Sequence, residues 1–149
     1  MKGIMRKAAV MLIIQDGTIL SISRRDDPSK FGLPGGKVAE NETTQQAAIR
    51  ETFEETSIVV NNCCHFFTRE DPKRSEDGVD FSVDCFYALS WEGEPTSSEE
   101  GIVKFLCAEE LTNHDIGAFA DYNARTLQAF KQLYPDVLLL ATKPTKEKP

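Results

Sequence analysis

Residues 36–58 read GKVAENETTQQAAIRETFEETSI, and this stretch carries the strongest structural pattern in the chain. Thr43 or Thr44 can cap a helix at its start, because a hydroxyl oxygen accepts a hydrogen bond from a backbone N–H of the first turn. The alanines and glutamines that follow favour helix propagation. We therefore predict a helix over residues 43–57.

Three carboxylates share one side of this predicted helix. At roughly 100° per residue, Glu51, Glu54 and Glu55 fall within an arc of about 100°. The same wheel places Ile49 and Phe53 on a ridge that is predicted to face the core. Each like-charged pair costs about 0.2–0.5 kcal/mol, and Mg²⁺ with its preference for oxygen ligands would relieve that repulsion. A solvated acidic face is the simpler alternative for such a pattern.

The residues just before the helix make the metal interpretation stronger. The sequence Leu33-Pro34-Gly35-Gly36 lets the backbone turn tightly and approach a ligand closely. An ordinary turn explains two glycines taken alone, but few structural reasons explain a glycine loop that leads into an acidic helix face. Glu42 at the helix start complements the helix dipole, and from there it could also face a metal.

These spacings resemble the signature of the Nudix hydrolase superfamily, and the length and element order of the chain are similar to its MutT-like members. The matching positions are Gly36, Glu42, Arg50, Glu51, Glu54 and Glu55. Two positions depart from the signature, since Thr52 stands where an aliphatic residue is usual and Ser57 where glycine is usual. Ser57 is expected to be strained if the helix ends there with positive φ, whereas Asn41, also at a common glycine position, tolerates that conformation.

The resemblance implies hydrolysis of a nucleoside diphosphate linked to another moiety, with Mg²⁺ or Mn²⁺ as cofactor. It implies that the metal ligands are Gly36, Glu51, Glu54 and Glu55. Arg50 would orient a carboxylate through charge-assisted hydrogen bonds. Glu51 is the first choice for the general base, with Glu99 or Glu100 as alternates, because related enzymes often supply a further acid from that loop. The expected catalytic set is Arg50, Glu51, Glu54 and Glu100.

Substrate contacts are expected from residues outside the helix. Arg24, Arg25, Lys30 and Lys37 flank the glycine loop and are locally basic in an acidic chain, which suits the attraction of a polyphosphate. We favour Arg25 and Lys37, together with the backbone of Gly35 and Gly36, although solvated surface charge would also explain the cations.

A base-recognition site is expected near the start of the last helix. Phe119 or Tyr122 could stack on a base, and the Asn123 amide could read a purine edge with its donor and acceptor together. The alternative is that the aromatic residues belong to the core and that Asp121 or Asn123 caps the helix. We take Tyr122 and Asn123 as the candidates.

Strands and helices alternate along the rest of the chain. The apolar run 8–14 predicts a buried strand, and Asp16-Gly17 predicts a type I′ turn into a second strand. The remaining predicted elements are strands at 18–23, 58–67, 79–89 and 102–107, a helix at 121–134, an ordered loop at 24–36 and a charged turn at 68–78. This order predicts an α/β (α+β) domain with a mixed sheet flanked by helices, and the resemblance implies an α/β/α sandwich. We expect one domain over residues 1–140 and a disordered tail over 141–149.

Composition narrows the range of partners. The chain has 149 residues, with 24 Asp+Glu against 17 Lys+Arg and a net charge of −7. This charge disfavours a large nucleic-acid footprint but allows a small nucleotide. No apolar run approaches the roughly 20 residues of a membrane span. The four cysteines contain no CxxC pair, so we expect reduced thiols in a cytoplasmic protein. A monomer and a homodimer are both compatible with the sequence.

Three functions fit these observations. The first is Mg²⁺-dependent cleavage of a nucleoside triphosphate to a monophosphate and pyrophosphate. The second is cleavage of ADP-ribose or a nucleotide sugar, and the third is a catalytically silent nucleotide-binding module. Retention of all three helix glutamates counts against the third, because a site without a cation gains nothing from their repulsion.

Overall fold

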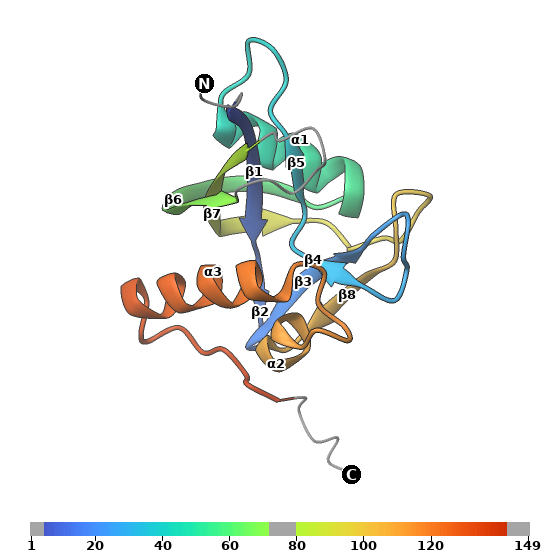
Figure 1. The fold of residues 1–149 in the computed structure, drawn as a ribbon, viewed down its shortest axis with the longest axis vertical. Coiled ribbons are helices and arrows are strands. Elements are labelled where there is room, and N and C mark those ends of the chain that lie inside the picture. The colour runs from blue at the N-terminus through green and yellow to red at the C-terminus, as the bar shows by residue number, and fades with distance from the viewer. Residues whose placement is uncertain (1–4, 72–79, 143–149) are drawn as a thin grey trace.

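The computed structural model describes residues 5–71 and 80–142 of the chain. Two sheets form its centre (Figure 1). The first sheet has the strand order β5 (Gly35–Lys37), β1 (Met5–Leu12), β7 (Asp80–Glu92) and β6 (Val59–Asp71). It is mixed, because β1 runs parallel to β7 but antiparallel to β5, and β6 runs antiparallel to β7.

The second sheet is smaller and is built around β3 (Thr18–Ser23). Its other strands are β2 (Ile14–Gln15), β4 (Phe31–Gly32) and β8 (Val103–Leu106). The turn between β2 and β3 has the predicted form, since Asp16 and Gly17 have φ values of 52° and 80°, both in the region that a type I′ turn requires.

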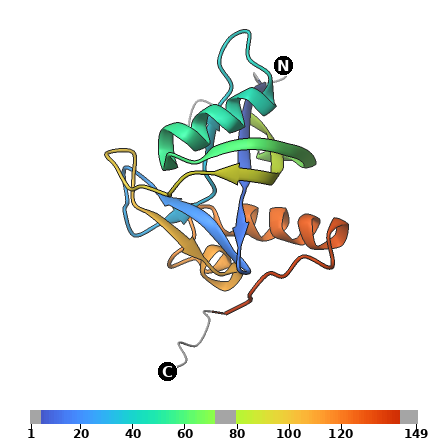
Figure 2. The same ribbon diagram turned by 180° about the vertical axis from the view of Figure 1, so that it is seen from behind.

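Helices cover both faces of the first sheet (Figure 1, Figure 2). Helix α1 (Thr44–Thr56) packs on one face, and α3 (Ala120–Leu133) packs on the other, with the short α2 (Ala108–Thr112) beside it. Strand β1 packs against helices on both faces of the first sheet. Ala9 lies in the same hydrophobic cluster as Ala47 and Ala48 of α1, whereas Leu12 lies in the cluster that contains residues of α3. This explains the continuous apolar run at its position. The predicted mixed sheet between helices is confirmed.

Several predicted boundaries change in the structure. Strand β6 continues to Asp71, so the prediction of a turn beginning at residue 68 is wrong; its residues pair with β7, as Arg69 does with Val83. Residues 72–79, the rest of that predicted turn, lie outside the described residues. The predicted loop 24–36 contains β4 and the start of β5. The carbonyl of Ala141 accepts a hydrogen bond from Glu109 N, and residues 143–149 of the expected tail lie outside the described residues.

Helix α1 begins and ends as its sequence indicates. The Thr43 side chain accepts a hydrogen bond from Gln46 N, and the Gln46 side chain accepts one from Thr43 N. Ser57 ends the helix with φ 70° and Asn41 precedes it with φ 65°, so both stand in the left-handed region where related sequences carry glycine. Ser57 therefore carries the strain that its sequence position predicted.

The predicted core-facing ridge of α1 is wrong. Phe53 is 53% exposed, and the buried residues of the helix are Ala47, Ala48, Thr52 and Thr56. Small side chains on this face let the helix lie close to β1 and β5, which turns Glu51 and Glu55 toward the sheet instead of away from the core. The carboxylate face and the buried face therefore overlap.

Thr52 offers a stability test inside this helix. Its hydroxyl is inaccessible to solvent. Among the described residues it is the one solvent-inaccessible side-chain polar atom that makes no hydrogen bond. Thr52→Val is expected to raise the free energy of unfolding by about 1–3 kcal/mol, because it removes an unpaired buried hydroxyl at nearly constant volume. Urea unfolding with an unchanged slope measures this.

Thr56 provides the matched control one helical turn later. It is equally buried, but its hydroxyl donates to Thr52 O at 2.7 Å and accepts from Ile58 N at 3.2 Å. Thr56→Val should therefore lower the free energy of unfolding by about 1–3 kcal/mol. Equal effects of the two valine substitutions would contradict the assignment of an unpaired hydroxyl at Thr52.

Candidate active site

Two glycines of β5 bring the backbone against the acidic side of α1. A Cβ at Gly36 would lie 2.7 Å from the Glu51 Cδ, so only the absence of a side chain makes room for that carboxylate. Gly35 N donates to Glu55 Oε1 at 2.9 Å. Because β5 lies beside α1, its two glycines position Glu51 and Glu55, which are two of the predicted metal ligands.

Arg50 links the remaining carboxylates of the signature. Its Nε and Nη2 donate to Glu42 at 2.7 and 3.0 Å, and its Nη1 donates to Glu51 at 3.0 Å and to Glu54 at 3.1 Å. The guanidinium lowers the pKa of Glu42 to about 2. Glu42 also accepts from Ala39 N, so it anchors Arg50 in this structure instead of facing the other acids.

Burial changes the acidity of the two glutamates that face the sheet. Desolvation raises the pKa of Glu55 to about 8, against the opposing hydrogen bond from Gly35 N, and the charges of Glu51, Glu100 and Glu54 raise it further. Desolvation also raises the pKa of Glu51, although Arg50 lowers it. Such carboxylates favour a proton or a cation beside them.

Glu100 approaches this cluster from the loop before β8. Its charge acts on both Glu51 and Glu55, and Arg25 Nη2 donates to its Oε1 at 2.6 Å. Glu99, the other candidate from this loop, is exposed. The structure therefore favours Glu100 over Glu99 as the additional acid near the site.

The donor set suits a hard cation. Glu51, Glu54 and Glu55 offer only oxygen atoms, which Mg²⁺ and Mn²⁺ prefer. Over residues 5–71 and 80–142 no three acidic, His or Cys side chains converge on one point, and Arg50 holds the Glu51 and Glu54 carboxylates. The close approach of the Glu51 carboxylate to Gly36 and the raised pKa of Glu55 are the features that fit a bound ion.

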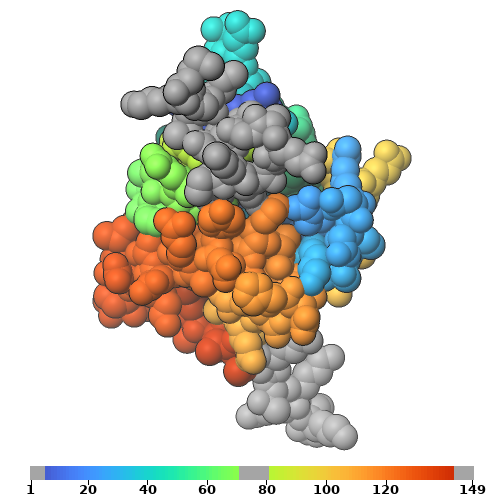
Figure 3. Space-filling view, viewed as in Figure 1, coloured from blue at the N-terminus to red at the C-terminus, as the bar shows by residue number. Residues whose placement is uncertain are grey.

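Glu55 and Glu100 line a cleft of about 650 Å³, whereas Arg50, Glu51 and Glu54 are not among its lining residues. The cleft lies where the loop after β3 meets the segment that leads into α3, and these two segments are adjacent on the face shown in Figure 3. The predicted site residues that line it are Arg25, Gly35, Gly36, Lys37, Glu55, Glu100 and Asn123.

The other two candidate cations, Arg24 and Lys30, are paired with groups of the protein. Arg24 lines the cleft, pairs with Asp26 at 2.7 Å, and lies over the Phe119 ring at 4.8 Å from its centroid. Lys30 donates to His114 O at 2.6 Å.

The predictions for α3 need two corrections. Tyr122 lines a neighbouring cavity of about 420 Å³ instead of the cleft, because successive helical residues point about 100° apart and Asn123 takes the cleft-facing direction. The Asn123 amide cannot offer donor and acceptor together, since its Nδ2 donates to Leu111 O and Ala118 O, both at 2.9 Å. Its Oδ1 alone can serve a ligand.

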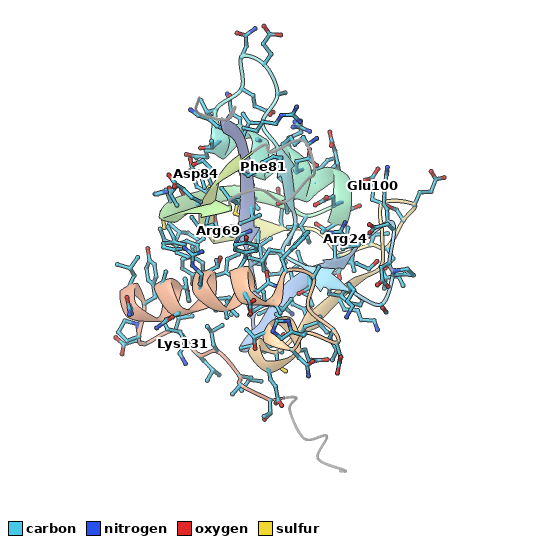
Figure 4. All side chains as sticks on the ribbon, in the orientation of Figure 1. Arg24, Arg69, Phe81, Asp84, Glu100 and Lys131 are labelled. Atoms are coloured by element: carbon cyan, nitrogen blue, oxygen red, sulfur yellow. The ribbon has the colours of Figure 1, made fainter. Side chains whose placement is uncertain are left out.

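Arg69 is a cleft residue that sequence reasoning missed. It is 5% exposed on β6, lines the cleft, and lies between the first sheet and α3 (Figure 4). Strand alternation gave no clear signal for it, because the pairing of β6 with β7 shifts register between His65 and Phe67. Arg69 also stands among the charged residues that predicted a turn at 68–78, so its sequence surroundings gave no sign of a cleft position.

The pKa of Glu55 predicts a pH-dependent stability of the metal-free protein. Its pKa is about 8 when folded and about 4.5 when unfolded, so the folded state holds the proton more tightly. The free energy of unfolding is therefore expected to fall as pH rises from about 5 to about 8.5, by an amount on the order of a few kcal/mol. Urea unfolding in the presence of a chelator measures it.

Glu55→Gln isolates this effect from other titrating groups. The variant keeps an acceptor for Gly35 N but has no proton to lose, so its stability advantage over the wild type should grow with pH. Mg²⁺ should raise the melting temperature of the wild type more at high pH than at low pH, because the proton and the ion compete. Parallel pH curves for the two proteins would refute the assignment.

None of the helices among the described residues has both the length and the apolar character that crossing a membrane requires.

Comparison with known proteins agrees with this geometry. A family model described as the NUDIX domain matches residues 5–130. An ADP-ribose pyrophosphatase of Methanocaldococcus jannaschii is 44% identical over 50 residues, which cover 32% of this chain and 30% of that protein's length.

Solved structures share the fold. The E. coli ORF135 protein aligns with a TM-score of 0.71 at 24% identity, over 88% of this chain and 91% of that one. The Nudix domain of Shewanella oneidensis NrtR, solved with ADP ribose, aligns with a TM-score of 0.67 at 20% identity, over 89% of each chain. The expected family and fold are confirmed. Because the family model spans most of the described residues and the carboxylate helix lies within it, this chain belongs to the Nudix family.

Proposed function

We propose that this protein hydrolyses a phosphoanhydride bond in a nucleoside triphosphate, releasing a nucleoside monophosphate and pyrophosphate. The observation that carries the proposal is a cleft in which Glu55 of α1 and the nearby Glu100 face the same space as Arg25 and Lys37, with the pKa of Glu55 raised to about 8 by burial. Acids at one part of a cleft and cations in its wall suit a metal–polyphosphate complex.

The proposed metal ligands are Glu51, Glu54, Glu55 and the backbone of Gly36. A bound Mg²⁺ or Mn²⁺ would neutralise phosphate charge and lower the pKa of a water molecule. Arg50 positions the Glu51 and Glu54 carboxylates through its hydrogen bonds.

Glu51 is the proposed general base, with Glu100 as the alternate. Burial raises the pKa of Glu51, and a base whose pKa is closer to neutrality removes a proton from water more effectively. Arg25 and Lys37 would contact phosphate oxygens, and Arg25 already bonds Glu100, so substrate would have to share that guanidinium.

A second candidate substrate is ADP-ribose or a related nucleotide sugar. The M. jannaschii relative favours it, since that protein is named for this activity and matches a 50-residue stretch of this chain. A silent nucleotide-binding module would use the same cleft without cleavage. We further propose a cytoplasmic location, a small nucleotide as the partner in place of a nucleic acid, and either a monomer or a homodimer.

A substrate panel tests the proposal. Nucleoside triphosphates, ADP-ribose and nucleotide sugars are incubated with Mg²⁺, with Mn²⁺ and with a chelator. Phosphate that appears only after inorganic pyrophosphatase is added supports triphosphate cleavage to a monophosphate. Phosphate that appears from ADP-ribose only after a monoesterase is added supports the second candidate. No metal-dependent cleavage of any anhydride would refute both.

A further inference from the structure

Arg25 and Glu100 form an ion pair in the wall of the cleft. Arg25 follows β3 and Glu100 precedes β8, so the pair joins two loops at positions 75 residues apart in the chain. The Arg25 Nη2 donates to Glu100 Oε1 at 2.6 Å, and both residues line the same cleft as Glu55. Figure 4 shows Glu100 on the same side of the molecule as Arg24, the neighbour of Arg25.

The backbone around Glu100 is held in a tight turn. Ser98 N donates to Gly101 O at 3.1 Å, Gly101 N donates to Ser98 O at 3.2 Å, and Glu100 N donates to Ser98 Oγ at 3.1 Å. After this turn, Ile102 N donates to Ser23 Oγ at 2.8 Å and Ser23 N donates to Ile102 O at 2.9 Å. These bonds tie the loop to the end of β3, so the Glu100 carboxylate can change partners by side-chain rotation while the backbone stays in place.

The ion pair itself is exposed and therefore easy to open. The side chains of Arg25 and Glu100 are 68% and 39% exposed. Exposed ion pairs are weak, because water and salt screen the two charges. Among the described residues, neither side chain makes a second hydrogen bond that would hold it in this position. A ligand of either charge can therefore compete for its partner in the pair.

Each partner of the pair weakens the binding of a ligand to the other. The negative charge of Glu100 acts on Glu51 and Glu55, which favours a divalent cation beside them, and Arg25 cancels part of that charge. The positive charge of Arg25 favours a phosphate group in the cleft, and Glu100 cancels part of that charge in turn. The pair therefore lowers the affinity of the empty cleft for both kinds of ligand.

We propose that the Arg25–Glu100 pair is a latch that couples phosphate binding to cation binding. A phosphate group that binds Arg25 competes for its guanidinium and makes Glu100 available to the cation. A cation that attracts Glu100 makes Arg25 available to the phosphate in the same way. Each ligand therefore binds more tightly when the other is present, beyond the direct attraction between the two. This inference rests on the proposed function, since it takes the ligands to be a divalent cation and a phosphate group.

Arg25→Gln tests the cation half of the latch with Mn²⁺ alone. The unbound ion is counted by its electron paramagnetic resonance signal, so no nucleotide and no turnover are needed. We expect this variant to bind Mn²⁺ about two- to fivefold more tightly than the wild type, a range set by the strength of an exposed ion pair. Lys37→Gln is the matched control, because it removes the same charge from the same cleft and Lys37 makes no ion pair with Glu100 in the described part of the chain.

A Glu100→Gln background separates the latch from the simple removal of positive charge. If Arg25 acts through Glu100, the gain from Arg25→Gln should shrink there to the size of the gain from Lys37→Gln. The gain from Lys37→Gln should be the same in both backgrounds. A gain from Arg25→Gln that persists in full without the Glu100 carboxylate, or no gain when that carboxylate is present, would overturn the proposal.

Glu100→Gln tests the phosphate half in the presence of a chelator. Methylenediphosphonate, whose P–C–P bridge resists hydrolysis, is titrated into the protein by calorimetry. Removal of the competing carboxylate should tighten its binding by about two- to fivefold. Glu99→Gln removes the same charge from the neighbouring exposed position, so its effect should be clearly smaller. Equal effects of the two substitutions would overturn the proposal.

These binding measurements do not depend on catalysis. Both gains in a protein that cleaves no nucleotide would support the latch and refute the proposed hydrolysis. The absence of both gains in a protein that cleaves nucleotides would overturn the latch and leave the hydrolysis in place. Circular dichroism checks that each variant is folded, which we expect because the substituted side chains of the pair are exposed.

Discussion

Replacing Glu54 or Glu55 by glutamine is expected to lower kcat by at least about 10²-fold, while the protein stays folded. Glutamine keeps the shape of the side chain but is neutral and binds a divalent ion poorly. The Gln at position 55 can still accept from Gly35 N, and Glu54 is half-exposed, so neither change opens a cavity. Steady-state rates against Mg²⁺ concentration measure the loss, and calorimetric titration with Mg²⁺ alone should show weakened ion binding.

Glu94→Gln provides the control for charge. Glu94 is an exposed acid in the loop before β8, so the substitution changes net charge by the same amount at a distance from the cleft. Its kcat and Mg²⁺ dependence should equal those of the wild type. Wild-type rates in both the Glu54 and the Glu55 variant would show that these residues do not hold the ion.

Alanine substitutions at the two glycines of β5 should have different effects. We expect Gly36→Ala to lower activity and Gly35→Ala to lower stability. A Cβ at Gly36 meets the far end of the Glu51 side chain at 2.7 Å, so Gly36→Ala should displace that carboxylate. We expect a fall in kcat of about 10²-fold with a melting temperature close to that of the wild type. Circular dichroism and steady-state assays on the same sample test both parts.

Gly35→Ala is the contrasting variant. Its Cβ would overlap the carbonyl oxygen of Ala9 and lie 2.7 Å from Val10 Cα, and backbone atoms cannot rotate away as a side chain can. The pairing of β5 with β1 must open, so we expect a loss of at least about 3 kcal/mol in the free energy of unfolding. A stable Gly35→Ala protein, or an unfolded Gly36→Ala protein, would contradict the assigned contacts.

Local chemistry explains why much of the fold was predictable. The helix of residues 44–56 carries its own capping pair, the turn at Asp16-Gly17 carries its own φ preference, and the apolar run of β1 requires burial on both faces. Each of these depends on residues close together in the chain. The spacing of the helix glutamates was likewise enough to predict a candidate cation site.

Other features depended on contacts between distant segments. The helical wheel placed Phe53 on the side of α1 that was predicted to face the core. In the structure the small residues Ala48, Thr52 and Thr56 are buried against the sheet and Phe53 is exposed. Tyr122 and Asn123 are neighbours in sequence, but α3 directs only Asn123 into the cleft. Arg69 became a cleft residue because β6 is irregular and continues into the first residues of the predicted turn.

The sequence by itself determined the family, the α1 helix with its glutamates, and most of the strands β1, β6 and β7, since hydrophobic period, capping and turn preferences act over a few residues. Only the tertiary structure decided which face of α1 is buried, which donors and acceptors reach the cleft, and how far the pKa of Glu55 rises. The physical reason is that burial and hydrogen-bond partners are set by segments that are far apart in the chain, and no local pattern encodes their distance in space.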